Sequence, residues 1–274
     1  MKSYTRMSNE DNRHPFLLVK GLTVEFGGLS ALMNVDLEVS EGGIRGIIGP
    51  NGAGKTTLFN ALTGFVKAAA GEVKYQGEDI LGLRPYEIAK KGVIRTFQGG
   101  GIFSEMNVLE NLMTGYHRLL ESSLLEVAFR FRKNKSEAKK IWGKALRLLE
   151  ALKLKDLAES LAGDLSFGQQ RLVELGRALM SDPKLLLLDE PAAGLSSSER
   201  DDLIQLLKGI AGGNGIYILL TDHSMDFVMG ICDYITVLNY GQVIGEGKPE
   251  DIQKNREVIE AYLGHEGESD ASGR

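Results

Sequence analysis

The sequence predicts an α/β protein with an antiparallel β subdomain near its start and an inserted α-helical subdomain in its middle. Three observations lead to this fold class. Residues 16–40 alternate apolar and polar positions, residues 107–179 show long helical periodicity, and buried strands alternate with helices from residue 184 onward. Strands that alternate with helices imply a parallel sheet, which presents ligands at the carboxyl ends of its strands.

The first third of the chain is expected to open with antiparallel strands and a hairpin, because glycines break the apolar runs of residues 16–40. Residues 44–50 then predict a short buried strand, which runs directly into a glycine-rich loop and a helix over residues 55–65. Further short strands are expected at residues 71–80 and 92–98.

The remaining two thirds change from helices to alternating strands and helices. The middle third predicts helices at residues 107–120, 136–154 and 167–180. The last third predicts a strand at 184–190, a helix at 197–212, a strand at 215–222, a helix at 224–233 and a hairpin at 234–247.

Composition indicates a globular protein of one large or two modest domains, since 43% of the 274 residues are hydrophobic and 25% are charged. We expect a flexible lead-in at residues 1–15, one domain at 16–263 with its helical subdomain at about 100–180, and a flexible tail at 264–274. No apolar run approaches the roughly 20 residues that cross a bilayer, and the lead-in lacks the apolar region of a signal peptide.

Charge and cysteine content limit the partners and the cellular environment that are expected for this protein. The formal charge of −5 argues against an overall attraction to nucleic acid, so no nucleic-acid partner is expected. The single cysteine, Cys232, excludes an internal disulfide and favours a reducing, cytoplasmic environment. Cys232 itself is expected to fill the core.

The segment "GPNGAGKTT" matches the pattern of a phosphate-binding loop between a strand and a helix. Its glycines allow successive backbone N–H groups to point at phosphate oxygens, and the following helix adds its positive end. Lys55 is expected to reach the β- and γ-phosphates, Thr56 to hold Mg²⁺, and Thr57 to support the α-phosphate. The alternative is an ordinary glycine turn, which the flanking strand and helix disfavour.

The segment "LLLLDEP" is expected to add acidic residues to the site formed by the phosphate-binding loop. Its four leucines predict a strand buried on both faces, and Asp189 and Glu190 follow at its carboxyl end. Asp189 is suited to hold hydrated Mg²⁺, while Glu190 is suited to accept a proton from an attacking water. Alone, such a pair is usually a solvated turn; the phosphate-binding loop favours the functional interpretation.

Two further strand ends carry candidate groups. Gln98 has an amide that can contact a metal shell and hydrogen-bond a water. His223 follows another buried strand and can donate a hydrogen bond to a γ-phosphate, although a histidine at a strand end is more often structural.

A second anion-binding segment, "LSFGQQ", lies more than a hundred residues after the glycine-rich loop. Ser166 precedes a helix with a leucine stripe, so its simplest role is an N-cap worth about 1 kcal/mol. The functional alternative is that Ser166 and Gly168 present donors to the terminal phosphate of a nucleotide held by another chain. The two anion sites would then meet when two molecules pair head to tail.

Together these segments resemble the ATP-binding cassette (ABC) ATPases, a P-loop NTPase family, from about residue 16 to residue 263. "GPNGAGKTT" is similar to their Walker A motif, "LLLLDE" to Walker B and "LSFGQ" to the signature, with Gln98 as the Q-loop glutamine and His223 as the switch histidine. The resemblance adds Phe26 as the aromatic residue that stacks on adenine.

The resemblance implies ATP and Mg²⁺ as cofactors and a full set of site residues. Catalysis is assigned to Lys55, Gln98, Glu190 and His223, and the metal to Thr56, Gln98 and Asp189. Nucleotide contacts are assigned to Phe26, Gly49, Pro50, Asn51, Gly52, Ala53, Gly54, Lys55, Thr56, Thr57, Ser166, Gly168 and Gln169.

Several segments, including "RTFQ", "MNVLENL" and the closing "VIEAYLG", resemble the ATPase subunit of branched-chain amino acid importers. This implies an ATPase that works as a homodimer or with a sister subunit, on two membrane permeases and indirectly a substrate-binding protein, at the inner face of the plasma membrane. Related urea and amide importers and lipopolysaccharide-type exporters are alternatives. A regulatory cassette that binds ATP without hydrolysis is a further alternative, which the intact Lys55, Asp189, Glu190 and His223 disfavour.

Four positions depart from the family pattern: Phe167, Ser196, Asp222 and Ser224. Phe167 replaces the commonest glycine of the signature, while the other three keep polar groups, so we expect ATPase activity to survive. The loop after Gln98 offers Ile102, Phe103 and Met106 either as a receptor for a permease helix or as a closure of the helical subdomain. The basic run "RFRKNKSEAKK" is expected to be a solvated helix face, with lipid headgroups as the alternative.

Overall fold

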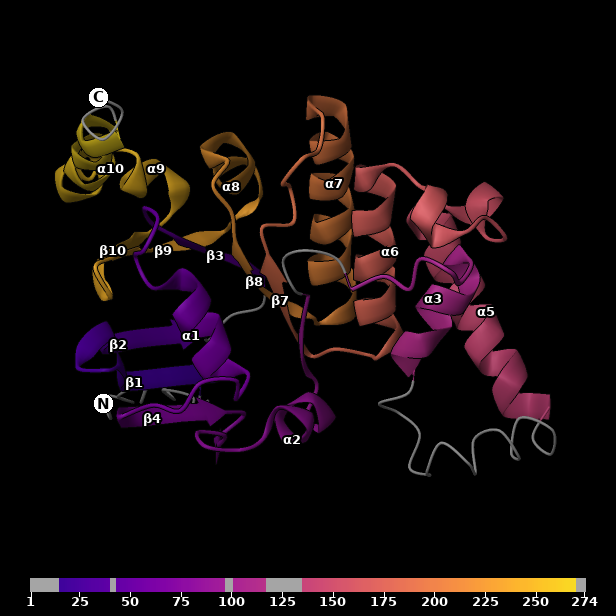
Figure 1. Cartoon of the computed structure of the whole chain (residues 1–274), viewed down its shortest axis with the longest axis horizontal. Helices are drawn as coiled ribbons and strands as arrows, with labels where there is room; N and C mark the ends of the chain where they lie inside the picture. Colours follow the sequence, from indigo (N-terminus) through magenta and orange to yellow (C-terminus); the bar gives the residue numbers. More distant parts are fainter. Residues whose placement is uncertain (1–14, 40–42, 97–100, 117–134, 270–274) are drawn as a thin grey trace, which may run out of the picture.

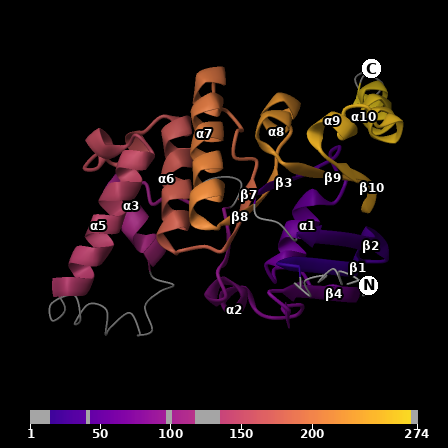
Figure 2. The ribbon, with the colours of Figure 1, turned by 180° about the vertical axis from the view of Figure 1, so that it is seen from behind.

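The computed structural model describes residues 15–39, 43–96, 101–116 and 135–269. Within them the chain forms an antiparallel sheet, a larger mixed sheet flanked by helices, and a lobe of helices at one end (Figure 1). The view from behind shows the helical lobe and the antiparallel sheet at opposite ends of the molecule (Figure 2). This architecture confirms the predicted fold class.

The antiparallel sheet has the order β2-β1-β4-β5, formed by β1 (Leu17–Phe26), β2 (Leu29–Val39), β4 (Ala70–Tyr75) and β5 (Glu78–Asp79). The hairpin expected in residues 16–40 is present as β1 and β2. Residues 71–80, expected as one strand, instead contain a hairpin, because Gln76 and Gly77 both adopt positive φ, 51° and 80°. Two consecutive left-handed residues make the tight turn that joins antiparallel strands.

The larger sheet has the order β10-β9-β3-β8-β7-β6. Its strands are β3 (Ile44–Ile48), β6 (Val93–Arg95), β7 (Leu185–Asp189), β8 (Tyr217–Thr221), β9 (Tyr234–Asn239) and β10 (Gln242–Gly247). Neighbouring strands are parallel except for the β9–β10 hairpin. The carboxyl ends of β3, β6, β7 and β8 therefore lie along one edge, as the sequence pattern predicts.

Successive leucines of β7 enter two different cores, because side chains of a strand alternate between its faces. Leu185 and Leu187 join the core that contains the antiparallel sheet and α1 (Lys55–Leu62). Leu186 and Leu188 join the core that contains α7 (Ser197–Asn214), α8 (Met225–Ile231) and the helical lobe. The strand is buried on both faces as predicted.

The helical lobe comprises α3 (Val108–Thr114), α5 (Lys135–Ala151) and α6 (Phe167–Met180), with short 3₁₀ turns at Lys155–Leu157 and Ala162–Asp164. These helices pack on one another through buried apolar side chains, among them Leu112, Ile141 and Val173. All three helices lie within the range in which a helical subdomain is expected.

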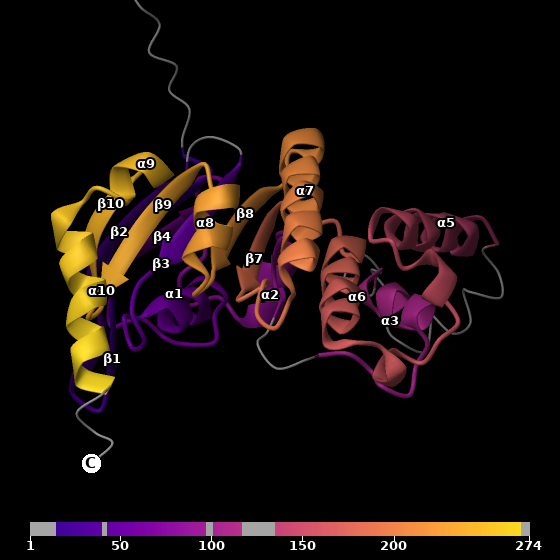
Figure 3. The ribbon, with the colours of Figure 1, turned by 90° about the horizontal axis from the view of Figure 1, so that it is seen from above.

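The described residues contain three more helices, for which the sequence analysis made no prediction: α2 (Pro85–Lys90), α9 (Pro249–Ile252) and α10 (Arg256–Ser269). Seen from above, α10 lies beside β10 at the end opposite the helical lobe (Figure 3). The helix continues past residue 264, where a flexible tail is expected, because adding residues to an existing helix costs much less than starting one.

Burial makes the Cys232 thiol a reporter of unfolding, since its side chain is buried and burial raises its pKa. We expect a thiol-specific reagent such as DTNB to leave native Cys232 unmodified at pH 8 and to modify one thiol per chain in denaturing urea, because the thiolate is the reactive form. Rapid modification of the native protein would show that the residue does not fill the core.

Candidate functional site

The glycine-rich loop connects β3 to α1 at the carboxyl edge of the larger sheet. Gly49 has φ 151°, and a Cβ there would lie 2.0 Å from the carbonyl oxygen of Leu238. Gly54 has φ 104°, and a Cβ there would lie 2.8 Å from the carbonyl oxygen of Ala31. Only glycine fits at these two positions, so the loop shape depends on them.

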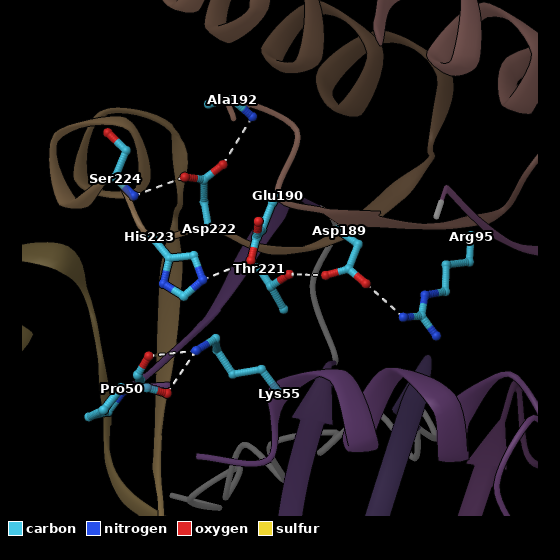
Figure 4. Close-up of polar contacts among 11 residues, drawn as sticks. Pro50, Lys55, Arg95, Asp189, Glu190, Ala192, Thr221, Asp222, His223 and Ser224 are labelled. Atoms are coloured by element: carbon cyan, nitrogen blue, oxygen red, sulfur yellow. Dashed lines mark hydrogen bonds and ion pairs between the residues drawn. The ribbon is translucent and has the colours of Figure 1, made fainter. Parts of the chain in front are cut away.

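Lys55 begins α1, and its ammonium group points back into the loop (Figure 4). Its Nζ donates hydrogen bonds to the carbonyl oxygens of Gly49 at 2.6 Å and Pro50 at 2.9 Å. Burial lowers the pKa of Lys55, and the negative charges of Glu190 and Asp189 oppose that change. The loop thus holds a buried cation at the place where a phosphate group would be cradled.

Asp189 ends β7 with its side chain only 5% exposed. Its Oδ1 accepts a hydrogen bond from the Thr221 hydroxyl at 2.8 Å, and its Oδ2 accepts one from Arg95 Nη2 at 2.6 Å. The sequence analysis did not identify Arg95 or Thr221. The available signal was their position at the ends of two strands that flank β7 in the sheet.

Glu190 and His223 are in contact across the edge of the sheet, with Glu190 Oε1 2.7 Å from His223 Nε2 (Figure 4). Glu190 has φ 50°, a left-handed conformation that is unfavourable for a residue with a Cβ. Its N–H donates to the Thr221 carbonyl at 2.8 Å, which holds it in this conformation. A carboxylate held this way beside an imidazole is suited to proton transfer.

Asp222 joins the segment after Glu190 to the segment after His223. Its Oδ2 accepts a hydrogen bond from the Ala192 N–H at 3.0 Å, and its Oδ1 accepts one from the Ser224 N–H at 2.9 Å. The Ser224 hydroxyl caps α8 by accepting from the Phe227 N–H at 3.4 Å. Both departures from the family pattern therefore have structural partners.

The segment "LSFGQQ" forms the start of α6. Ser166 and Gln169 make a capping box, in which the Ser166 Oγ accepts from the Gln169 N–H at 3.3 Å. This confirms the N-cap role of Ser166, which uses the hydroxyl oxygen as an acceptor and leaves its O–H to donate elsewhere. Ser196 makes the same kind of box with Glu199 at the start of α7.

Gly168 and Phe167 pack against the loop that follows β7. A Cβ on Gly168 would lie 2.6 Å from Glu199 Oε1, and one on Gly194 would lie 2.8 Å from the Phe167 ring. Phe167 is nevertheless 53% exposed. The start of α6 thus contacts the start of α7, while α7 stands between α6 and the phosphate loop in Figures 1 and 3.

The remaining predicted positions fall into three groups. Phe26 lies at the end of β1 with half of its surface exposed, as stacking on a ligand requires, and Asn51, Gly52 and Thr56 are also exposed. Pro50 and Ala53 are buried, and Thr57 is half-buried. Gln98 lies outside the described residues.

The donor set fits Mg²⁺ in the way that nucleotide sites usually hold it. Thr56 and Asp189 offer a hydroxyl and a carboxylate, the hard oxygen ligands that Mg²⁺ prefers. Among the described residues no group of three or more His, Cys, Asp or Glu side chains could hold a metal ion. Phosphate oxygens and water would supply the other ligands.

Comparison with known proteins decides the family. Residues 32–193 match the family model described as ABC transporter, and residues 242–268 match the model described as branched-chain amino acid ATP-binding cassette transporter. The chain belongs to the ABC transporter ATP-binding family. The resemblance inferred from the motifs is therefore confirmed.

Relatives of this ABC chain match over nearly their whole length. It is 45% identical to BraF, a high-affinity branched-chain amino acid transport ATP-binding protein of Pseudomonas aeruginosa, over 91% of this chain and 98% of BraF. It is 42% identical to a probable LivG of Archaeoglobus fulgidus, over 90% of this chain and 95% of that protein.

Two solved ABC cassettes share the fold. One, in an ADP conformation, is 37% identical with a TM-score of 0.80 and covers 92% of this chain and 99% of its own. Another is a dimeric cassette in a post-hydrolysis state bound to ADP and phosphate, 26% identical with a TM-score of 0.72, over 85% of this chain and 98% of its own.

The second family match includes a residue that reaches the phosphate loop. Tyr262 on α10 is largely buried, which raises the pKa of its phenol to about 12, and its hydroxyl accepts a hydrogen bond from the Gly49 N–H, which opposes that rise. Val258, one turn earlier, packs against Gly245 of β10 and holds the helix in place. The sequence analysis missed Tyr262 because no spacing in the chain relates it to Gly49.

We expect Tyr262→Phe to weaken ATP binding by about threefold to tenfold, because one hydrogen bond contributes about 1 kcal/mol. Titration with a fluorescent ATP analogue would measure the dissociation constant. Ile259→Ala on the exposed side of the same helix is the control and should leave ATP affinity unchanged. Equal affinities for Tyr262→Phe and wild type would show that the contact does not support the loop.

Proposed function

We propose that this chain is the ATP-hydrolysing subunit of an ABC importer for branched-chain amino acids. The observation that carries the proposal is the match of residues 242–268 to the branched-chain cassette model, on a chain that aligns with 98% of BraF. The Walker A loop, the Asp189–Glu190 pair and His223 supply the groups that ATP hydrolysis requires.

In the proposed site, the loop N–H groups and the start of α1 bind the phosphates. The Lys55 ammonium exchanges its two loop carbonyls for β- and γ-phosphate oxygens, which are stronger acceptors because they are charged. Thr56 and Asp189 hold Mg²⁺, which neutralises charge on the phosphates when it is bound. Phe26 stacks on the adenine.

Glu190 is the proposed base that takes a proton from the attacking water. His223, whose Nε2 lies 2.7 Å from Glu190 Oε1, is placed to donate to the γ-phosphate of a bound nucleotide. Asp222 links the backbone beyond both residues, so a movement of one segment is passed to the other. Gln98 is proposed to contact the metal shell and the water.

In the proposed ATPase cycle, the second anion site acts in a head-to-tail dimer or in a pair with a sister subunit. The Ser166 hydroxyl and the first N–H groups of α6 would bind the terminal phosphate held by the partner subunit. Changing a pair from mostly open to mostly closed requires about 5.5 kcal/mol of differential binding. Two phosphates with charge-assisted hydrogen bonds worth about 3 kcal/mol each are sufficient, and hydrolysis removes them.

A groove beside the loop that follows Gln98 is the proposed receptor for the membrane permeases. Its cavity of about 490 Å³ is lined by Phe103, Gly115 and Arg177 among others. Phe103 is half-exposed under the Arg177 guanidinium at 5.5 Å, whereas Ile102 packs into the helical core. Of the residues expected to meet a permease helix, Phe103 and Met106 are therefore exposed, whereas Ile102 is partly buried.

The groove is joined to the signature helix by hydrogen bonds. The Gly101 N–H donates to Glu174 Oε1 at 2.9 Å, and Arg177 donates to the Gly101 carbonyl. Glu174 and Arg177 both belong to α6, so a permease helix that moves Gly101 would also move the signature. None of the described helices is long and apolar enough to span a bilayer. In the proposed complex the chain is held at the inner face of the membrane by its permeases.

Comparison of wild type with Lys55→Ala and Glu190→Gln tests the ATPase assignment. We expect both variants to lose more than about 99% of ATP turnover, because each removes a group that acts in the transition state. Only Glu190→Gln should form a stable dimer in ATP and Mg²⁺, measured by gel filtration, since it binds ATP without cleaving it. Undiminished turnover in either variant would contradict the assignment.

Uptake in the source cells tests the substrate. Deleting the gene that encodes this chain should reduce uptake of labelled leucine, isoleucine or valine. Expression of the wild-type protein should restore uptake, and expression of the Lys55→Ala variant should not. Uptake of urea and of short amides is measured in parallel. Loss of urea or amide uptake with normal leucine, isoleucine and valine uptake would assign the chain to the related importers instead.

A further inference from the structure

The Arg95 side chain binds the carboxylate of Asp189, the group that the proposed function assigns to Mg²⁺. Its guanidinium donates through Nη2 to Asp189 Oδ2 at 2.6 Å and through Nη1 to Asn60 Oδ1 at 2.6 Å. The side chains of Arg95 and Asp189 are only 4% and 5% exposed. Arg95 also lies over the Phe59 ring at 5.5 Å. The guanidinium is therefore fixed between the end of β7 and the helix that begins at the phosphate loop.

A buried carboxylate without a cation is costly, so something must balance Asp189 when no metal is bound. Lys55 directs two N–H donors to the carbonyls of Gly49 and Pro50, and no hydrogen bond joins it to Asp189 among the described residues. Thr221 donates one hydrogen bond but carries no charge. Arg95 is positively charged at any physiological pH, so it supplies this balance.

We propose that Arg95 is a positioning residue that stands in for Mg²⁺ at Asp189. It holds the carboxylate in position before Mg²⁺ and nucleotide bind and gives up that contact when they do. Asn60 lowers the free-energy cost of the exchange, because Arg95 keeps its hydrogen bond to Asn60 while Asp189 turns to the metal. This inference rests on the proposed nucleotide site.

The exchange has a measurable consequence that an ordinary buried ion pair lacks. If Arg95 and Mg²⁺ compete for Asp189, removing the guanidinium strengthens metal binding and weakens the binding of metal-free ATP, whose negative charge the guanidinium attracts. The ratio of ATP affinity with Mg²⁺ to ATP affinity in EDTA therefore rises. A purely structural pair would lower stability without changing this ratio.

The test compares wild type with Arg95→Gln, using a fluorescent ATP analogue with Mg²⁺ or EDTA and Mn²⁺ binding by electron paramagnetic resonance. We expect Arg95→Gln to lower the melting temperature of the nucleotide-free protein and to raise the affinity ratio by about tenfold, the effect of a charge-assisted hydrogen bond. Mn²⁺ affinity in the presence of ATP should rise by a similar factor.

Arg45→Gln is the matched control, because Arg45 pairs with Glu246 at 3.2 Å and stacks over Tyr234 at 4.4 Å, with no contact to the phosphate loop among its hydrogen bonds and ion pairs in the described residues. It should lower the melting temperature and leave the ratio unchanged. An Arg95→Gln ratio within about twofold of wild type, given the tenfold expected from the charge-assisted bond, would overturn the proposal.

Arg95→Lys decides the question if Arg95→Gln does not fold. A lysine keeps the charge but cannot bridge Asn60 and Asp189 as the planar fork does, so it holds Asp189 less firmly. Its affinity ratio should exceed that of wild type, and an unchanged ratio would overturn the proposal. Wild-type protein that binds no ATP with Mg²⁺ would instead overturn the proposed function, and this inference with it.

Discussion

The register of three buried parallel strands is the constraint on which the rest of this cassette depends. Pairing of β7 with β8 sets Asp189 beside Thr221, and pairing of β6 with β7 brings Arg95 to the same edge. A slip of one residue would turn every side chain of a strand to the opposite face and separate the carboxylate from its partners. The leucines of β7 resist such a slip because they fill two different cores. Packing far from the phosphate loop thus determines where the Asp189 carboxylate points.

Local chemistry was predictable from the sequence, and contacts between distant segments were not. The phosphate loop, the buried strand before Asp189 and the buried Cys232 each follow from a few adjacent residues. The hairpin at Gln76–Gly77 and the helices at Pro85 and Pro249 had local signals as well, a glycine turn and a proline at the first helical turn, which the analysis did not use. Arg95 and Tyr262 are different, because only the folded sheet brings them to Asp189 and Gly49.

The two anion-binding segments belong to different parts of one molecule. The phosphate loop is fixed to the sheet by glycines that tolerate no Cβ, whereas the signature begins a helix of the separate helical lobe. Phe167 and Gly168 connect the signature to the loop after Glu190 through close contacts with Gly194 and Glu199. Glu174 and Arg177 connect the same helix to Gly101, in the loop that we propose faces the permeases. One helix therefore contacts both the segment after Glu190 and the loop proposed to face the membrane.

The contact between Tyr262 and Gly49 also bears on how the protein is made. A ribosome synthesises the phosphate loop long before Tyr262, so the loop gains this support only after the strands and helices between them have been made. A nascent chain held on the ribosome would carry every Walker residue and still lack the hydroxyl that steadies Gly49. A helix made after the whole sheet thus supports the loop that begins the nucleotide site.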